Sequence, residues 1–550
     1  MSLPIDARGE TPIADAPSPP SPPRPERTGR FAALIALGIL LSRLFGLVRQ
    51  RIFGHYFGTS DAADAFNAAA RIPNFLQNLF GEGVLSASFI PVYAGLLGRG
   101  ERDAADRLAG VIGALLALVT AILVALGIAL TPLLVSAVAV GFAGEKRDLT
   151  EMLVRIMFPG IGLLVCSAWC LGILNSHRKF LLSYAAPVAW NVVLIAALWW
   201  WGRQGIPLGR LAVIAAWAAV AGSGLQFAVQ LPSVFRLAPG LRPALDTASP
   251  HVRAVARAFA PVFVGRGVVQ ISGYIDASIA TLIAPGALSI FTYAQALYLL
   301  PGSLFGMSVS AAELPAMASL AGSEADVAPH LRRRLEAGLR RIAFFIVPSA
   351  TAFLALGDVV AAPVFRTGRF TQVDVMWVWA ALAGASLGLL SSTLGRLYSS
   401  TFYALRDTRT PLRFAVIRVA LTLVLGYGLA VPLPRALGLD PRWGIAALTT
   451  ASGIAGWVEF ALLRRALNRR LGATGLSGGF LGRLWLAAGL GAAAAWGVKL
   501  VIGTEHAVVL ALVALGVYAL LYLGATAAMS VGETGALLAG ARARLAARRR

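Results

Sequence analysis

The stretch LLSYAAPVAWNVVLIAALWWW, residues 181–201, decides the fold. It contains no charged residue, and as an α-helix it is long enough to cross the hydrocarbon core of a bilayer, which takes about 20 residues. The three consecutive tryptophans at its end, residues 199–201, are typical of the interface between lipid and water. The stretch therefore predicts a membrane-spanning helix that ends near Trp201.

Similar apolar runs recur along all of the 550 residues, of which 57% are hydrophobic and only 13% are charged. The runs do not alternate between apolar and polar residues, which excludes a membrane β-barrel. We therefore predict an all-α polytopic membrane protein with 14 transmembrane helices. The predicted spans cover residues 31–54, 63–97, 108–134, 150–174, 183–202, 208–231, 255–284, 288–318, 338–362, 374–404, 412–432, 444–466, 480–503 and 506–529.

The net charge of +22 is carried mainly between the spans. Most of the 48 Lys and Arg residues fall in the two tails and in the loops on the same side, which predicts that both termini are cytoplasmic. The densest patches, LRRRLEAGLRR (331–341) and ARARLAARRR (541–550), are typical of topology determinants beside anionic membrane lipids. This distribution argues against a nucleic acid as the partner.

An internal repeat predicts two lobes. LFGEGVLSASFIPVYAGLLGRGE (79–101) aligns with LFGMSVSAAELPAMASLAGSE (304–324), about six spans later. An even offset gives parallel repeats, so we expect two six-helix lobes related by a pseudo-two-fold axis, with a substrate site between them. The predicted organisation is a disordered Pro-rich cytoplasmic tail (1–30), an N-lobe (31–235), a C-lobe (250–470), an appendix of two helices (480–530) and a basic cytoplasmic tail (531–550).

The second predicted span carries a polar stripe. At 100° per residue, Asp64, Arg71, Asn78 and Glu82 fall within about 40° of one another, and Asn74 lies beside them. Such a face meets water or other protein rather than lipid. We predict that it forms the wall of a cavity, with a structural seam between helices as the alternative.

The stretch SRLFGLVRQRIFG (42–54) places three arginines in the first predicted span. Arg43 and Arg49 lie about 240° apart on an ideal helix, so they share a face only if the helix bends. Arg51 suits an interfacial anchor as well as it suits the cavity. Because a guanidinium can bind a phosphate with two parallel hydrogen bonds, we expect Arg43 and Arg49 to bind the anionic head group of an amphiphile.

The seventh predicted span adds Arg266 and Asp276. Charges within spans are costly and usually face a cavity or each other. We therefore treat Arg266 as a cavity residue and Asp276 as a candidate ion-coupling site, and a structural pair between the two is the alternative.

The sequence argues against an enzyme. It holds no Walker A loop, no HExxH motif and no GxSxG motif with partners for a triad. The acids of DAADAF (61–66) stand at a predicted helix start, where N-capping explains them. We predict no catalytic residue, no metal site and no cofactor.

The arginine-containing first span and the polar second span resemble those of a known family. SRLFGLVRQ…FG…DAADAFNAAARIPNFLQNLFGEGVLSASFIPVYA resembles the bacterial lipid II flippase family MurJ (MviN), of the MOP exporter superfamily. The similarity is dense over residues 38–100. It continues through ILNSHRKF (173–180), QISGYID (270–276), GRFT (368–371) and FYALRDTRTP (402–411).

The resemblance implies two six-helix lobes around a cationic cavity, with the last two helices forming a groove for a lipid tail. It implies a flippase that moves lipid II, the undecaprenyl-pyrophosphate-linked peptidoglycan precursor, across the bacterial cytoplasmic (inner) membrane by alternating access. It also implies coupling to Na⁺ or to the membrane potential. The expected partners are this polyprenyl-pyrophosphate glycolipid, membrane lipids and the peptidoglycan-synthesis machinery.

The family's functional residues correspond here to Arg43, Arg49, Asp64, Glu82 and Ser289. The polar break before the eleventh span corresponds to Asp407, which joins Asp276 as an ion-coupling candidate.

Three positions depart from the family's usual residues. Gln50 replaces an acid, and Gln77 and Ala296 replace cavity arginines. Arg71 or Arg266 would have to compensate for the missing charges. The alternatives are therefore an exporter of another lipid-linked oligosaccharide and a non-transporting scaffold for envelope assembly.

Overall fold

The computed structural model describes residues 25–318, 324–502, 506–537 and 539, and this part of the chain is helical without strands. Twelve segments are long and apolar enough to cross a membrane. Two further long helices, α1 and α9, are not among the twelve. The elements are α1 (Pro25–Phe57), α2 (Asp61–Phe80), α3 (Glu82–Gly98), α4 (Arg102–Ala129), α5 (Thr131–Val138), α6 (Gly144–Ser176), α7 (Phe180–Gly202), α8 (Leu208–Leu237), α9 (Pro250–Ile283), α10 (Ala287–Pro301), the π-helix η1 (Gly302–Met307), α11 (Ser308–Ala318), α12 (Glu324–Phe365), α13 (Gln372–Ala404), α14 (Arg409–Ala430), α15 (Pro432–Ala436), α16 (Trp443–Leu471), α17 (Gly478–Ile502) and α18 (Ala507–Ala528).

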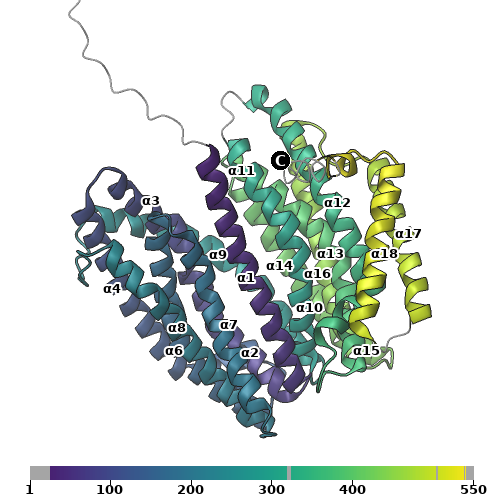
Figure 1. Ribbon diagram of the computed structural model, residues 1–550, viewed down its shortest axis with the longest axis horizontal. Helices are drawn as coiled ribbons and strands as arrows, with labels where there is room; N and C mark the ends of the chain where they lie inside the picture. The colour runs from purple at the N-terminus through teal and green to yellow at the C-terminus, as the bar shows by residue number, and fades with distance from the viewer. Residues whose placement is uncertain (1–24, 319–323, 503–505, 538, 540–550) are drawn as a thin grey trace, which may run out of the picture.

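The helices form two groups, α2–α8 and α10–α18, with α1 and α9 running between them (Figure 1). We call the end of the bundle where α1 ends and α2 begins the distal end, and the opposite end the proximal end. α1 packs along α7. α9 contacts both groups, because Val252 and Val255 join the core of α3, α4 and α6, whereas Ile279 and Ile283 join the largest core.

The second predicted span is two helices rather than one. The chain breaks at Gly81, whose backbone angles are φ −82° and ψ −154°, between α2 and α3. A Cβ atom at Gly81 would lie 2.3 Å from the carbonyl oxygen of Gln77, so only glycine fits there. Pro73 remains inside α2. The predicted face of this span therefore holds within α2 but not beyond it.

The predicted tails lie mostly outside the described residues. Residues 1–24 and 540–550 are outside them, but α1 begins at Pro25, so the predicted disordered segment 1–30 extends too far. Near the C-terminus, α17 and α18 pack against α12 through a separate apolar cluster that includes Leu356 and Tyr518.

Candidate functional site at the distal end and in the central space

Asp64 joins the two helix groups at the distal end. Its side chain is buried, and its carboxylate accepts hydrogen bonds from the amide of Gly286 (2.7 Å) and from the amide and hydroxyl of Ser289 (2.9 and 2.7 Å). Gly286 directly precedes α10, so Asp64 of α2 caps the first amides of a helix in the other group. We call this contact between the two helix groups at the distal end the seam. The predicted site residues Asp64 and Ser289 therefore lie together.

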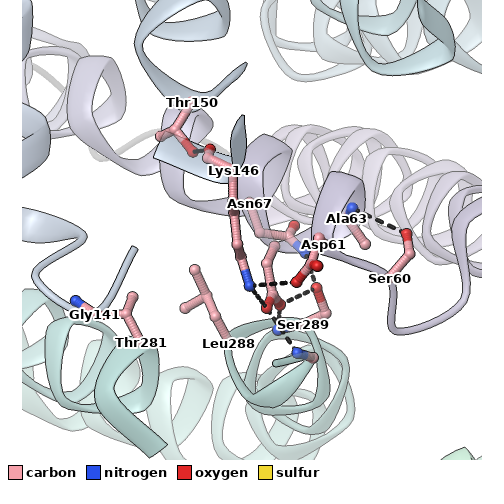
Figure 2. A network of polar contacts seen from close by, with 12 residues as sticks. Ser60, Asp61, Ala63, Asn67, Gly141, Lys146, Thr150, Thr281, Leu288 and Ser289 are labelled. Atoms are coloured by element: carbon pink, nitrogen blue, oxygen red, sulfur yellow. Dashed lines mark hydrogen bonds and ion pairs between the residues drawn. The ribbon is translucent and has the colours of Figure 1, made fainter. Parts of the chain in front are cut away.

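A lysine that sequence reasoning missed completes this cluster. Lys146, at the start of α6, places Nζ 2.6 Å from Asp64 Oδ2 and 2.8 Å from Asp61 Oδ1. Asn67 Nδ2 donates to Ser289 Oγ at 3.1 Å. Figure 2 shows Asn67, Lys146 and Ser289 gathered at this point. Lys146 stands in a polar stretch without periodicity, and its pairing with Asp64 left no signal in the sequence.

The end of α1 closes the same seam. The Arg51 guanidinium donates to the carbonyls of Pro363 and Val364, at the end of α12, and the second of these bonds is 2.9 Å long. His55 Nδ1 lies 2.8 Å from Thr367 Oγ1. Arg51 therefore joins the end of α1 to the end of α12 through protein carbonyls.

Three glycines with left-handed backbones let the chains approach here. Gly58, Gly286 and Gly368 have φ of +57°, +82° and +57°. A Cβ atom on them would lie 2.9, 2.6 and 2.3 Å from the carbonyl oxygens of Arg369, Thr59 and His55, respectively. A side chain at any of them would be strained and would also collide with backbone across the seam. The closed distal end therefore requires glycine, which has no side chain, at these three positions.

The polar stripe of α2 changes from buried to exposed along the helix. Asp64 and Asn67 are buried at the distal end, Arg71 is half-buried, and Asn74 and Asn78 are exposed. The stripe thus becomes more exposed with distance from the distal end. This is the arrangement of a cavity wall that is closed at one end.

Arg71 stands where the stripe leaves the seam. Its Nη2 donates to Thr292 Oγ1 at 3.3 Å, and its guanidinium carbon lies 5.5 Å from the centre of the Phe291 ring. The backbone oxygen of Arg71 accepts from the hydroxyl of Tyr274 at 2.8 Å. A cation at this depth without a direct carboxylate contact is suited to an anionic ligand.

Two of the predicted site residues, Glu82 and Arg266, are described only by their backbones. The side chains of Glu82 and Arg266 lie outside the described residues, although their backbones belong to α3 and α9.

Arg43 and Arg49 occupy different surroundings. Arg49 Nε donates to Asn191 Oδ1 at 3.0 Å, and its guanidinium carbon lies 4.9 Å from the Trp190 ring centre, so it joins α1 to α7. Arg43 is exposed on another side of α1 and makes no hydrogen bond or ion pair with another described residue. The two arginines, which lie about 240° apart on an ideal helix, therefore have different surroundings in the structure.

Asp276, on α9, faces polar residues of the α10–α18 group. Its carboxylate accepts from Ser452 Oγ at 3.0 Å, and the charges of Arg418 and Arg71 act on it. Arg418 is itself paired with Glu459 at 3.2 Å. Asp276 therefore has a hydrogen-bond partner on α16, and the predicted alternative partner, the side chain of Arg266, lies outside the described residues.

Asp407 has a local structural role. It accepts from the amides of Arg409 (3.1 Å) and Thr410 (3.0 Å) at the start of α14, and it pairs with Arg470 at 3.3 Å. Burial acts to raise the pKa of its carboxyl, but the bonds from Thr410 and the Arg470 charge outweigh burial, so the pKa lies below its usual range. A helix cap explains this residue.

An apolar pocket of about 550 Å³ lies between α2, α5, α9 and α14. Its inner wall includes Phe75 and Tyr274, whose ring centres are 5.1 Å apart. None of its lining residues is charged, so the pocket suits hydrocarbon rather than phosphate. Within the described residues, no group of three or more His, Cys, Asp or Glu side chains is placed to hold a metal ion.

Comparisons with known proteins agree on one family. The sequence profile of the family described as "Lipid II flippase MurJ" matches residues 53–525. A relative named lipid II flippase MurJ, from Burkholderia cenocepacia, is 33% identical over 450 residues, which are 80% of this chain and 84% of the relative. A relative from Rhizobium meliloti, named probable lipid II flippase MurJ, is 30% identical and covers 78% of this chain and 79% of its own length.

Solved structures share the fold. One described as "Lipid II flippase MurJ, inward closed conformation" matches with a TM-score of 0.74 and 23% identity, over 90% of this chain and 98% of that one. A multidrug resistance MATE family transporter of the MOP superfamily in an inward-facing conformation matches with a TM-score of 0.59 and 18% identity, over 80% of this chain and 99% of that one. At these identities the likeness concerns the fold.

Proposed function

This chain belongs to the lipid II flippase MurJ family, and we propose on that premise that it moves lipid II across the inner membrane by alternating access. The observation that carries the proposal is the polar stripe of α2, which is closed at Asp64 and open at Asn78. Such a passage, closed at one end, is what alternating access requires between substrate uptake and release. Flipping breaks no covalent bond, so no catalytic group is needed.

The topology that follows has fourteen crossings, made of the twelve apolar segments together with α1 and α9. Both termini are then on the cytoplasmic side, and the distal end faces outward. The bundle closed at Asp64 is therefore the state that receives substrate from the cytoplasm.

Two matching turns support a repeat of six spans. Arg178, between α6 and α7, and Arg406, between α13 and α14, have φ of +60° and +59°. In each turn the following amide, of Lys179 or Asp407, bonds a carbonyl five residues back at 2.9 Å. A third such turn follows α18 at Ser530, where the amide of Val531 bonds the carbonyl of Thr526 at 2.9 Å. The equivalent places of the first two, each between the fourth and fifth spans of its group, therefore favour two lobes that are related by a pseudo-two-fold axis.

The pyrophosphate of lipid II is assigned to Arg43 and Arg71. Both guanidinium groups lack a direct carboxylate contact among the described residues, and the amides of Asn74 and Asn78 extend the same wall. Arg43 is the arginine that the family shares, and the charge of Arg71 compensates for the arginines that are missing at Gln77 and Ala296. Arg49, held against α7, keeps α1 in position for Arg43.

Asp276 is the proposed coupling residue, for Na⁺ or for the charge movement that the membrane potential drives. Its carboxylate accepts from Ser452, and the charges of Arg418 and Arg71 act on it, so its ionisation changes the charge beside the substrate site.

Complementation tests the proposal. The chain is expressed in a bacterium whose sole lipid II flippase can be switched off, and growth is measured together with the accessibility of lipid II in the outer leaflet. We expect rescue by the parent chain and by Arg99→Ala, which removes a surface arginine, and no rescue by Arg43→Ala at equal protein levels. Failure of the correctly inserted parent chain would overturn lipid II as the substrate and favour another lipid-linked oligosaccharide.

A further inference from the structure

The helix α12 is broken close to the distal end. Leu356 has φ −128° and ψ 23°, which lie outside the helical region. Gly357 follows, and a Cβ atom there would lie 2.3 Å from Trp379 Cδ1, so the break is packed directly against α13. The break separates a distal segment, residues 357–365, from the rest of α12.

The backbone carbonyls next to the break accept hydrogen bonds from two tryptophans. Trp379 of α13 donates its indole N–H to the oxygen of Leu354 at 3.0 Å, and Trp496 of α17 donates to the oxygen of Ala355 at 2.8 Å. Within a membrane a carbonyl released from a helix must find another donor. The break is therefore stabilised from outside α12, and one of its two donors comes from the C-terminal hairpin α17–α18.

The same hairpin holds the distal segment through a buried ion pair. Lys499 Nζ of α17 lies 2.6 Å from Asp358 Oδ2, and the two side chains are 13% and 5% exposed. The Lys499 ammonium also lies 4.3 Å from the Trp496 ring centre and 5.3 Å from that of Trp379. Asp358 Oδ1 is buried without a hydrogen-bond partner among the described residues. Such a pair is costly within a membrane and adds little net stability, which points to a positioning role.

The other end of the distal segment meets the first group of helices. Pro363 and Val364 present the carbonyls that accept from Arg51 of α1. Just beyond it, the Arg369 amide donates to the oxygen of His55 at 2.9 Å. The start of the distal segment is thus bound by Lys499 of α17, and its end is bound by Arg51 of α1.

We infer that the Asp358–Lys499 pair positions the distal segment of α12 for Arg51, so that the C-terminal hairpin sets how firmly the distal end closes. With the pair intact, the carbonyls of Pro363 and Val364 are preorganised for the guanidinium. With the pair broken, the segment pivots at Leu356 and Arg51 loses its acceptors. The consequence for transport rests on the proposed function, whereas the effect on closure does not.

The distance across the distal seam tests this inference. In the full chain, with Cys166 and Cys170 replaced by alanine, spin labels are placed at residues 204 and 439, which are exposed on opposite sides of the seam. Electron spin resonance then measures the distance distribution in a lipid bilayer without substrate. We expect one short-distance population in the parent, and a fall of roughly tenfold in the ratio of closed to open molecules for Lys499→Met.

Two further variants separate positioning from general stability. The exchange of Asp358→Lys with Lys499→Asp is expected to restore the short distance. Glu533→Gln breaks the 2.6 Å pair with Arg340 on the proximal side of the break, and it is expected to leave the distance unchanged. Asp358→Asn, which removes the charge that is paired with Lys499, is expected to lower the ratio of closed to open molecules as well. It replaces Lys499→Met if that variant does not fold.

An unchanged distance in Lys499→Met and Asp358→Asn overturns the inference, and so does an equal shift in Glu533→Gln. Because no substrate is present, these results do not depend on whether the chain transports lipid II.

Discussion

The Asp64 carboxylate lies 2.9 Å from the amide and 2.7 Å from the hydroxyl of Ser289, so a residue of α2 caps a helix of the opposite group. The cap exists only while the distal end is closed. Opening that end exposes the first amides of α10 and separates a buried carboxylate from its donors, and substrate binding or outward release must offset this cost.

Replacing Asp64 by asparagine is expected to weaken this closure. The variant loses the charge paired with Lys146 and two of its acceptor positions, and we expect the free energy of unfolding to fall by about 3 kcal/mol. Thermal unfolding measures this change, and the distance across the seam measures closure. Asp61→Asn is the matched control, since Asp61 is exposed and its pair with Lys146 contributes about 1 kcal/mol or less. Equal effects of the two substitutions would contradict the capping role.

Gly368→Ala is expected to separate the two helix groups at the distal end. Its Cβ atom would lie 2.3 Å from the oxygen of His55, in addition to the strain of a φ of +57°. Gly205→Ala is the control, because Gly205 has a φ of +68° but nothing lies within 4 Å of the added atom. Both variants pay the backbone strain, about 1 kcal/mol, and only Gly368→Ala should lengthen the distance across the seam. If both lengthen it, strain rather than contact governs closure.

Arg49 and Arg43 should separate stability from transport. Arg49→Ala leaves Asn191 without its donor and removes the contact with Trp190, so we expect a loss of about 2 kcal/mol in unfolding free energy. Arg43→Ala should change stability by about 0.5 kcal/mol or less, because its side chain is exposed. It should nevertheless abolish the transport of lipid II. Unfolding and transport measured on the same preparations check both statements.

Asp407 provides a test that depends on pH. Because the pKa of its carboxyl lies below the ordinary value, the stability it contributes is present above about pH 4 and is lost as the pH falls through the lower folded value. Asp407→Asn should remove this part of the acid dependence and still cap α14, whereas Asp407→Ala should cost about 1 kcal/mol at neutral pH. Transport that survives in Asp407→Asn would exclude this carboxylate from ion coupling.

The sequence predicted which face of a helix is polar better than it predicted which residues contact that face. The helical period placed Asp64, Arg71 and Asn78 on one side of α2, and in the structure Asp64 and Arg71 both contact α10, through Ser289 and Thr292. The break at Gly81 was missed because proline, not glycine, carries the usual signal for a bend, and Pro73 is accommodated within α2.

The partners of these faces depend on the packing of helices far apart in sequence. Lys146 reaches Asp64 over 82 positions, and Arg51 reaches Val364 over 313. Asp358 and Lys499 each appear alone in an apolar run, and only the packing of α17 on α12 makes them a pair. Periodicity within one helix does not contain this information.

The most direct measurement of the central claim uses the purified chain in vesicles that contain labelled lipid II. An external enzyme that modifies the head group reports the fraction of lipid II that has reached the outer leaflet. The account predicts that the parent chain and Arg99→Ala carry lipid II outward, and that Arg43→Ala does not. Vesicles in which the folded parent chain leaves the inner-leaflet lipid II untouched, or in which Arg43→Ala works as well as the parent, would contradict it.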